Sequence, residues 1–92
     1  MKYRIHFTRL FRRQLKRAIK QGWQHKEIIE IIDNLAMEMM PSPYLKPHRL
    51  KGNFSGAWEL HIAPDLLLIY RYHENRGILE LSGIGTHSEL FG

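Results

Sequence analysis

Histidine is the residue type on which any chemistry of this sequence would depend. The chain has 6 histidines among 92 residues and no cysteine, and His48, His61 and His87 lie in the C-terminal half beside predicted loops. Because imidazole changes charge near neutral pH, two such groups can act as general base and general acid. A metal site and a scatter of unrelated surface side chains are the alternatives. Since the spacing fits no compact ligand pattern, we predict no metal and no cofactor.

A carboxylate follows one of these histidines closely in the chain. Alternation along the predicted strand places His61 on the opposite side from Leu60 and Ile62. Asp65 follows Pro64 in a tight turn, where its carboxylate can share a pocket rim with the imidazole and favour its charged form. The alternative is that Asp65 only forms the turn after proline.

The C-terminal segment 83–92 combines a histidine with an aromatic ring. Two glycines are expected to let the backbone leave the last strand sharply, and Thr86 is placed to cap a single helical turn. That turn would fix His87 and place Phe91 four residues further along. A ring that stacks an unpaired base beside an imidazole that moves protons suits RNA cleavage. Phe91 could equally be a hydrophobic plug that closes the core.

RNA is the substrate for which this set of side chains suffices without a metal. The 2′-hydroxyl is an internal nucleophile, so the protein need not generate an attacking water. A base must take the 2′ proton, an acid must protonate the leaving 5′ oxygen, and cations must neutralise the phosphorane. DNA lacks that hydroxyl, so a metal-free nuclease acting on DNA is disfavoured.

Positive charge is concentrated at the start of the chain. The net charge is +5, the first acidic residue is Glu27, and Lys and Arg recur before it. This pattern favours a nucleic-acid surface, with Arg12, Arg13 and Lys16 as candidate RNA contacts, over a docking face for an acidic protein or a solvated helix face. The longest apolar run, 66–70, is too short to cross a bilayer, so we expect a cytoplasmic protein with no membrane partner.

The N-terminal half predicts a strand followed by a helical hairpin. Residues 2–7 alternate as a strand, Thr8 can cap a first helix, and Gly22 is a natural stop. A second helix is expected to start near Gln24 or His25 and to end at Pro41. Its predicted apolar stripe consists of Ile28, Ile32, Leu35 and Met39, widened by Ile29 and Ala36.

The C-terminal half predicts an antiparallel meander. Residues 41–56 read as an irregular connector, and strands are expected at 58–62, 66–73 and 78–82. The first strand can join them only by crossing over the helical hairpin. The prediction is therefore one α+β domain over 1–92, with the hairpin on one face of a roughly four-stranded, mainly antiparallel sheet and the other face partly open.

Three linked motifs in this order resemble the YafQ branch of the RelE/ParE toxin superfamily. They are the run Leu50-Lys51-Gly52-Asn53-Phe54-Ser55-Gly56, the run from Glu59 to Tyr70, and Gly85-Thr86-His87-Ser88-Glu89-Leu90-Phe91. The resemblance implies a RelE-like microbial RNase fold and a type II toxin–antitoxin system. It also implies a toxin that cleaves messenger RNA in the ribosomal A site and is inhibited by an acidic antitoxin.

The resemblance also implies roles for individual residues. His48, His61, Asp65, His87 and Phe91 match positions that this branch uses at its active site. His87 would be the general acid, His61 or Asp65 the base, and Phe91 the base-stacking ring. His48 would assist with phosphate binding or proton transfer.

Two positions depart from the pattern of the branch. Leu66 stands where a Trp commonly follows the turn aspartate, and Gly83 stands where an arginine is common. The cation for the transition state must then come from elsewhere, with Arg71, Lys51 or Arg49 as candidates.

Two other functions compete with the endoribonuclease. A ParE-like gyrase inhibitor would share the fold but would have no need of paired proton-transfer groups. A catalytically weak module that binds RNA or antitoxin would keep the basic surface without the chemistry. Mapping transcript ends after incubation with programmed ribosomes separates these functions.

Overall fold

The computed structural model describes residues 2–92, in which helices and a mixed sheet are combined. Within that range the α-helices are α1 (Arg9–Lys20), α2 (His25–Ala36) and α3 (His87–Phe91). The strands are β1 (Arg4–Phe7), β2 (His48–Arg49), β3 (Trp58–Ala63), β4 (Leu66–His73) and β5 (Ile78–Gly85). Short 3-10 helices η1 (Pro43–Leu45), η2 (Gly52–Phe54) and η3 (Glu74–Arg76) occupy the connections. The α+β class predicted from the sequence is confirmed.

Helix α1 begins and ends where the sequence predicts. The Thr8 hydroxyl accepts a hydrogen bond from the Phe11 amide at 3.1 Å and donates one to the Leu81 carbonyl at 3.0 Å. Phe11 and Ala18 are fully buried, and Gly22 follows the helix with φ of 103°. The cap therefore both starts the helix and fixes it to β5.

Helix α2 is shorter than predicted. Ile28, Ile32 and Leu35 are buried as expected, but the helix ends at Ala36. Glu38 adopts a left-handed φ of 59°, which turns the chain away from the helical path. The prediction that Met39 extends the buried stripe is wrong, because this side chain lies beyond the helix and is 55% exposed.

The sheet has the order β1-β5-β4-β3-β2. β3, β4 and β5 form the predicted antiparallel meander, and β1 pairs in parallel with β5 after the crossover through the two helices. The predicted four strands become five because His48 and Arg49 pair with Glu59 and Trp58. The region predicted as an irregular connector thus contributes a short edge strand, which brings His48 beside β3.

Strand β5 runs three residues further than predicted, through both glycines to Gly85. A Cβ at Gly83 would lie 3.3 Å from Gln14 Oε1, and one at Gly85 would lie 3.0 Å from Glu89 Oε1. The glycines therefore do not end the strand as predicted. They allow side chains of α1 and α3 to approach the backbone closely.

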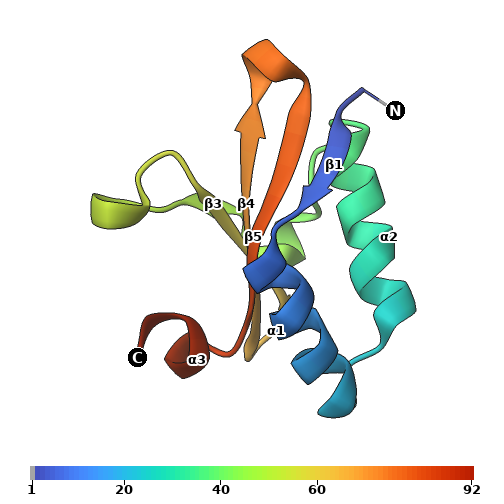
Figure 1. Cartoon of the computed structure of the whole chain (residues 1–92), viewed down its shortest axis with the longest axis vertical. Helices are drawn as coiled ribbons and strands as arrows, with labels where there is room; N and C mark the ends of the chain where they lie inside the picture. Colours follow the sequence, from blue (N-terminus) through green and yellow to red (C-terminus); the bar gives the residue numbers. More distant parts are fainter. Residues whose placement is uncertain (1) are drawn as a thin grey trace.

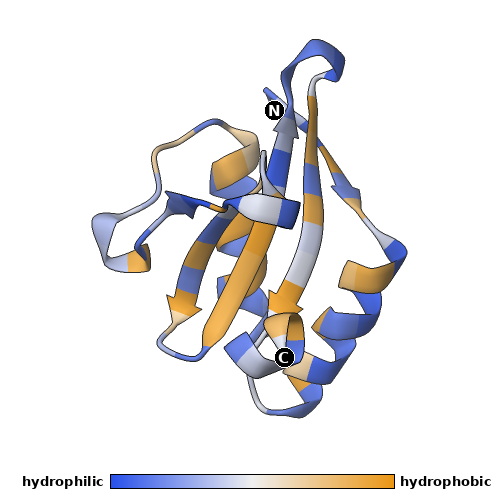
Figure 2. Ribbon diagram, turned by 90° about the vertical axis from the view of Figure 1, so that its left-hand side faces the viewer, coloured by the Kyte–Doolittle hydropathy of each residue, from blue (hydrophilic) through white to orange (hydrophobic). Residues whose placement is uncertain are grey.

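The two faces of the sheet differ in what covers them. α1 and α2 lie on one side, whereas the loop after β2 and helix α3 lie on the other (Figure 1). Leu68 and Tyr70 of β4 belong to the core under the helices, whereas Leu67 and Ile69 point to the opposite face and are also buried. β4 is accordingly hydrophobic over its first half, whereas β3 alternates (Figure 2).

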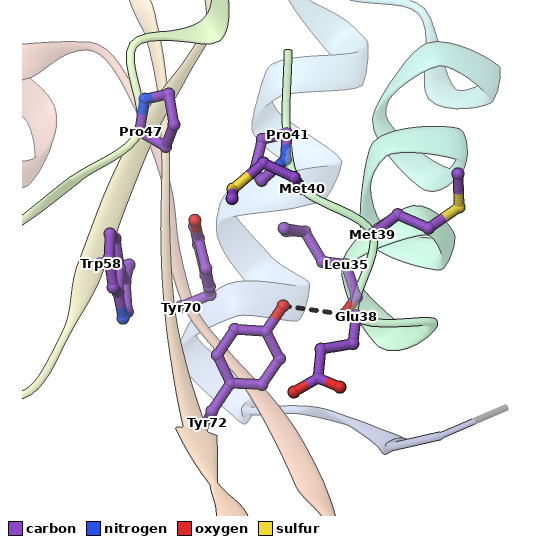
Figure 3. A pocket seen from close by; sticks show the side chains of 9 residues that line it. All are labelled: Leu35, Glu38, Met39, Met40, Pro41, Pro47, Trp58, Tyr70 and Tyr72. Atoms are coloured by element: carbon purple, nitrogen blue, oxygen red, sulfur yellow. Dashed lines mark hydrogen bonds between the residues drawn. The ribbon is translucent and has the colours of Figure 1, made fainter. Parts of the chain in front are cut away.

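An apolar cavity of about 270 Å³ lies between the end of α2 and the sheet (Figure 3). Leu35, Met40, Trp58 and Tyr70 are among its lining residues. Tyr72 also lines it, and its hydroxyl donates to the Leu35 carbonyl at 2.8 Å. Burial raises the pKa of Tyr72 to about 12, so the hydroxyl keeps the proton that this bond requires.

Within residues 2–92, no helix has the length and apolar composition that a membrane crossing requires.

Candidate active site

One candidate group lies on the edge strands β2 and β3. His48 Nε2 lies 3.1 Å from Glu59 Oε1, and His61 Nε2 lies 3.9 Å from the same oxygen. The two imidazole rings are 6.2 Å apart at their centroids. His48 comes from β2 and the other two residues from β3, so strand pairing sets the spacing. We call these three residues the histidine–glutamate cluster.

Glu59 is the member of this cluster that sequence reasoning missed. It is the only charged residue among the buried ones in residues 2–92, with 6% of its surface exposed. A buried carboxylate needs partners, and the two imidazoles supply them. The signal was present in the sequence, because Glu59 and His61 are two residues apart on a strand and must share a face.

The other candidate group is carried by helix α3, which begins as predicted with Thr86 as its cap. The Thr86 hydroxyl accepts from the Glu89 amide at 3.2 Å, and the Glu89 carboxylate accepts from the Thr86 amide at 2.8 Å. This reciprocal capping box fixes the first turn, on which His87 lies.

Glu89 also fastens α3 to α1. Its Oε2 lies 3.1 Å from Arg17 Nε and accepts a hydrogen bond from Gln21 Nε2 at 3.2 Å. The backbone hydrogen bond from Thr86, followed by the bond from Gln21, lowers the pKa of Glu89 below its usual value. The polar contacts that hold the short helix to α1 are therefore made by a single carboxylate.

The rings of His87 and Phe91 on α3 and of Phe54 in η2 lie next to one another. The Phe91 centroid lies 5.2 Å from that of His87 and 5.2 Å from that of Phe54 in η2. Phe91 is partly exposed and packs against the loop, so neither predicted role, free ring or buried plug, describes it alone. Phe54 is the second residue that sequence reasoning missed, and its signal was an aromatic residue in a glycine-rich loop.

The two groups lie on the same face of the sheet. Glu59 pairs across the strands with Ile69, and His61 pairs with Leu67, so all four side chains point away from the helical core. Ile69 Cδ1 and Leu90 Cδ2 of α3 both lie within 4 Å of a Cβ built on Gly83. Helix α3 therefore covers the face from which the histidine–glutamate cluster projects.

Asp65 is not brought into either group by a direct contact. It lies exposed in the turn between β3 and β4, as predicted. Its carboxylate forms no ion pair or hydrogen bond with another side chain in residues 2–92. It remains a candidate by its place at the end of the strand that carries His61.

The three candidate cations differ in how they are engaged. Arg71 Nη1 donates to the Ser55 carbonyl at 3.0 Å and so holds the loop that carries Phe54. The Arg49 guanidinium lies over the Trp58 ring at 5.1 Å from its centroid. Lys51 is exposed and has no ion-pair partner within residues 2–92. Lys51 is thus the candidate most able to reach a phosphate.

The two positions that depart from the resemblance are both buried. Leu66 is fully buried in the core, so it offers no surface to a base. The space beside Gly83 is filled by Gln14 and Leu90, and Gln14 Oε1 accepts from the Ile84 amide at 3.0 Å. Neither position can take part in RNA contacts without a rearrangement.

The basic residues Arg12, Arg13 and Lys16 are exposed on α1. Arg12 also makes local contacts, since its Nε donates to the Phe7 carbonyl at 3.3 Å. In residues 2–92 no group of three or more His, Cys, Asp or Glu side chains has an arrangement that could hold a metal ion.

Comparisons with known proteins agree with this architecture. The model of the family described as "Bacterial toxin of type II toxin-antitoxin system, YafQ" matches residues 3–92. The mRNA interferase toxin YafQ of Escherichia coli strain K12 is 28% identical over 89 residues, which are 96% of this chain and 95% of that protein. A crystal structure of a metal-bound toxin from Helicobacter pylori is 37% identical, with a TM-score of 0.91 and coverage of 99% and 100% of the two chains. One chain in the crystal structure of the E. coli DinJ-YafQ complex is 26% identical to this chain, with a TM-score of 0.88. The match covers 98% of this chain and 99% of the chain in the complex.

Proposed function

Because the chain belongs to the YafQ family of bacterial type II toxins, we propose that it is an endoribonuclease that cleaves messenger RNA in the ribosomal A site. The observation that carries this proposal is the common face of the sheet on which the histidine–glutamate cluster and helix α3, the carrier of His87, both lie. A phosphodiester placed between them would meet an imidazole on each side. The relatives named mRNA interferase supply the substrate class.

The reaction that suits these groups is attack by the RNA on itself. The 2′-hydroxyl loses its proton to a base and bonds to the adjacent phosphorus, while the bond from phosphorus to the 5′ oxygen breaks. The acid protonates that leaving oxygen. The products are a 2′,3′-cyclic phosphate and a 5′-hydroxyl, so no water or redox partner is consumed.

His61 or Asp65 takes the 2′ proton in this mechanism. His61 is better supported, because Glu59 stands beside its ring and can stabilise the imidazolium that forms when it accepts a proton. Asp65 has no such partner but is freely exposed at the turn. Glu59 is a positioning residue, since it acts through the imidazoles and not on the RNA.

His48 is suited to act on the phosphate through its charge, because both of its ring nitrogens already have protein partners. Its Nδ1 lies 2.9 Å from the Lys46 carbonyl, and its Nε2 lies 3.1 Å from Glu59 Oε1. Both neighbours are acceptors, and the imidazolium form can donate to both of them at once. A positive His48 beside the scissile group would stabilise the charge that develops on the phosphorane.

His87 serves as the general acid and Phe91 as the ring on which an unpaired base stacks. Both lie on the same side of α3 because they are one helical turn apart, and their rings are 5.2 Å apart at the centroids. A base on Phe91 would bring its own phosphate close to His87. Lys51 supplies a further positive charge in place of the arginine common at the position of Gly83.

The proposed chemistry needs no metal, since the nucleophile belongs to the substrate. Ribosomes require Mg²⁺, so general chelation would destroy the assay. We expect 1,10-phenanthroline, which removes transition metals and spares Mg²⁺, to leave the cleavage rate unchanged. A loss that added Zn²⁺ or Cu²⁺ restores would overturn metal independence while leaving the substrate assignment intact.

An acidic antitoxin is the second partner that we propose. The net charge of +5 favours such a partner, and a relative matched over 99% of its own chain forms a complex named DinJ-YafQ. A neighbouring reading frame that encodes a short acidic protein is expected. Co-expression of that protein should relieve growth arrest and co-purify with this chain.

The test of the proposed function is a cleavage assay with purified 70S ribosomes programmed with a defined messenger. Primer extension should map new 5′ ends within the A-site codon, and the 3′ fragment should carry a 5′-hydroxyl. The same RNA without ribosomes is the control and should stay intact. Intact messenger together with trapped gyrase–DNA complexes would replace the proposal with gyrase inhibition.

A further inference from the structure

Phe54 is an exposed aromatic side chain in a loop whose backbone is well fixed. It is 40% exposed, whereas Phe11 in the core is fully buried. The Ala57 amide donates to the Phe54 carbonyl at 3.0 Å, and the Ser55 amide donates to the Gly52 carbonyl at 3.0 Å. The ring is therefore not exposed because its loop lacks structure.

Arg71 clamps the loop from the face of the sheet. Its Nη1 donates to the Ser55 carbonyl, and the same atom would lie 3.0 Å from a Cβ at Gly56. Gly56 has φ of 91°, so the turn after Phe54 needs glycine for its conformation and for the close approach of Arg71. The clamp holds Phe54 against α3.

Phe54 and Phe91 meet at nearly a right angle. Their centroids are 5.2 Å apart and their planes are inclined by 81°. In such an edge-to-face pair the two ring planes form a corner. A flat nucleobase can lie on one ring face of the corner while its edge abuts the other ring, and a second base can use the second ring face.

From this geometry we propose that Phe54 and Phe91 form a two-ring site for unpaired nucleobases, in which Phe54 stacks a base adjacent to the one held by Phe91. The inference rests on the proposed function, because it assigns a second base contact to the same cleavage site. The second ring would supply a stacking surface that Leu66, which is fully buried, does not offer.

A structural role alone explains Phe54 less well. Packing against Phe91 requires an apolar side chain of similar volume, which leucine would provide. Stacking of a base requires a flat π-face, which leucine lacks and tryptophan enlarges. Phe54→Leu and Phe54→Trp therefore separate the two roles.

The experiment compares wild-type protein, Phe54→Leu and Phe54→Trp in single-turnover cleavage on programmed ribosomes. Phe54→Leu should lower the rate at subsaturating toxin by about 10- to 100-fold, the loss typical of one base–aromatic stack, and Phe54→Trp should stay within about threefold of wild type. Tyr44→Leu is the matched control, since Tyr44 is another aromatic residue in a short 3-10 helix, is 92% exposed and lies outside the group of rings formed by Phe54, His87 and Phe91. Its rate should not change.

A binding readout complements the rate. Messenger RNA carrying 2-aminopurine at each position of the A-site codon in turn should lose fluorescence at two adjacent positions with wild-type protein. Phe54→Leu should restore fluorescence at one of them, whereas Phe54→Trp should not. Circular dichroism and melting curves establish that the variants are folded.

Several results would overturn the inference. The inference is wrong if wild type and Phe54→Leu cleave at equal rates. It is also wrong if Phe54→Leu and Phe54→Trp lose the same fraction of the cleavage rate. Unchanged cleavage together with weakened inhibition by the antitoxin would reassign Phe54 to a protein interface. Absence of cleavage by the wild type is a different outcome, because it refutes the proposed function itself.

Discussion

The two halves of the candidate site are held in place by different means. His48 and His61 project from paired strands, and a buried carboxylate stands between them. His87 lies on a helix of five residues, outside the sheet, that is held by the contacts of Glu89 with Thr86, Arg17 and Gln21. The first half is positioned by backbone pairing between two strands, and the second by a helix cap together with side-chain contacts to α1.

Because of this difference, mutations can distinguish residues that take part in the reaction from residues that hold them in position. In the strand-borne half the supporting residue is buried next to the groups it orients, so its removal takes away their contact partner directly. In the helix-borne half the supporting residue faces α1, on the side away from Phe91 and Phe54. Its removal should loosen the helix without altering the imidazole itself.

The largest effect is expected at His87. Replacement of His87 by alanine removes the proposed general acid, and we expect single-turnover cleavage to fall by about 100- to 10,000-fold. The fold should persist, because the side chain is exposed and the cap is made by Thr86 and Glu89. Growth arrest and transcript mapping provide the readouts. Equal toxicity of the variant would remove the helix-borne half from the mechanism.

Glu59→Gln tests the strand-borne half. The variant keeps the shape of the side chain but loses a charge-assisted contact of about 1.5–3 kcal/mol, so we expect cleavage to fall by about 10- to 100-fold. The matched control is Glu80→Gln, on the same sheet, where Glu80 accepts from His73 and Ser82 at 2.9 Å each. Its cleavage rate should stay within about twofold of wild type. Equal effects of the two changes would mean that Glu59 acts through stability alone.

The sequence predicted the helix-borne half better than the strand-borne half, for a physical reason. The cap, His87 and Phe91 lie within one turn of helix, so their spacing follows from local rules. The contact of His48 with Glu59 depends on a two-residue strand, and no periodicity predicts so short a pairing. Likewise, the alternation of β3 fixes the face of the sheet on which Glu59 lies. The burial of Glu59 depends on the neighbouring strands, which the alternation does not predict.

A third prediction concerns the support of α3. Loss of a helix cap costs about 1 kcal/mol, so Glu89→Ala should lower cleavage by about three- to tenfold while leaving the global melting temperature nearly unchanged. Amide exchange should accelerate in α3 but not in β4. Glu30→Ala, an exposed glutamate on α2, is the control. A global loss of stability in Glu89→Ala would contradict a local role.

The pH dependence of this support has a definite sign. The pKa of Glu89 is lowered in the folded chain, chiefly by the hydrogen bond from the Thr86 amide. Its contribution is therefore present above the unfolded value near 4.5 and is lost as the pH falls through the lower folded value. The NMR signals of α3 should broaden below that pH in wild type, and Glu89→Ala should show this mobility already at neutral pH.

The smallest effect is expected from the basic surface of α1. This helix contacts the helix-borne half through Arg17 and Gln21, and Arg13 and Lys16 are exposed within one helical turn of Arg17. Each phosphate contact contributes about 0.7–0.9 to the slope of log affinity against log salt. The double variant Arg13→Gln/Lys16→Gln should therefore reduce the slope for ribosome binding by up to about 1.8.

Arg12 is left intact because it donates to the Phe7 carbonyl, and Lys26→Gln on α2 serves as the charge control. If the slope is unchanged and antitoxin binding weakens instead, the basic face of α1 belongs to the protein partner, and the RNA is held by the sheet and its loop alone.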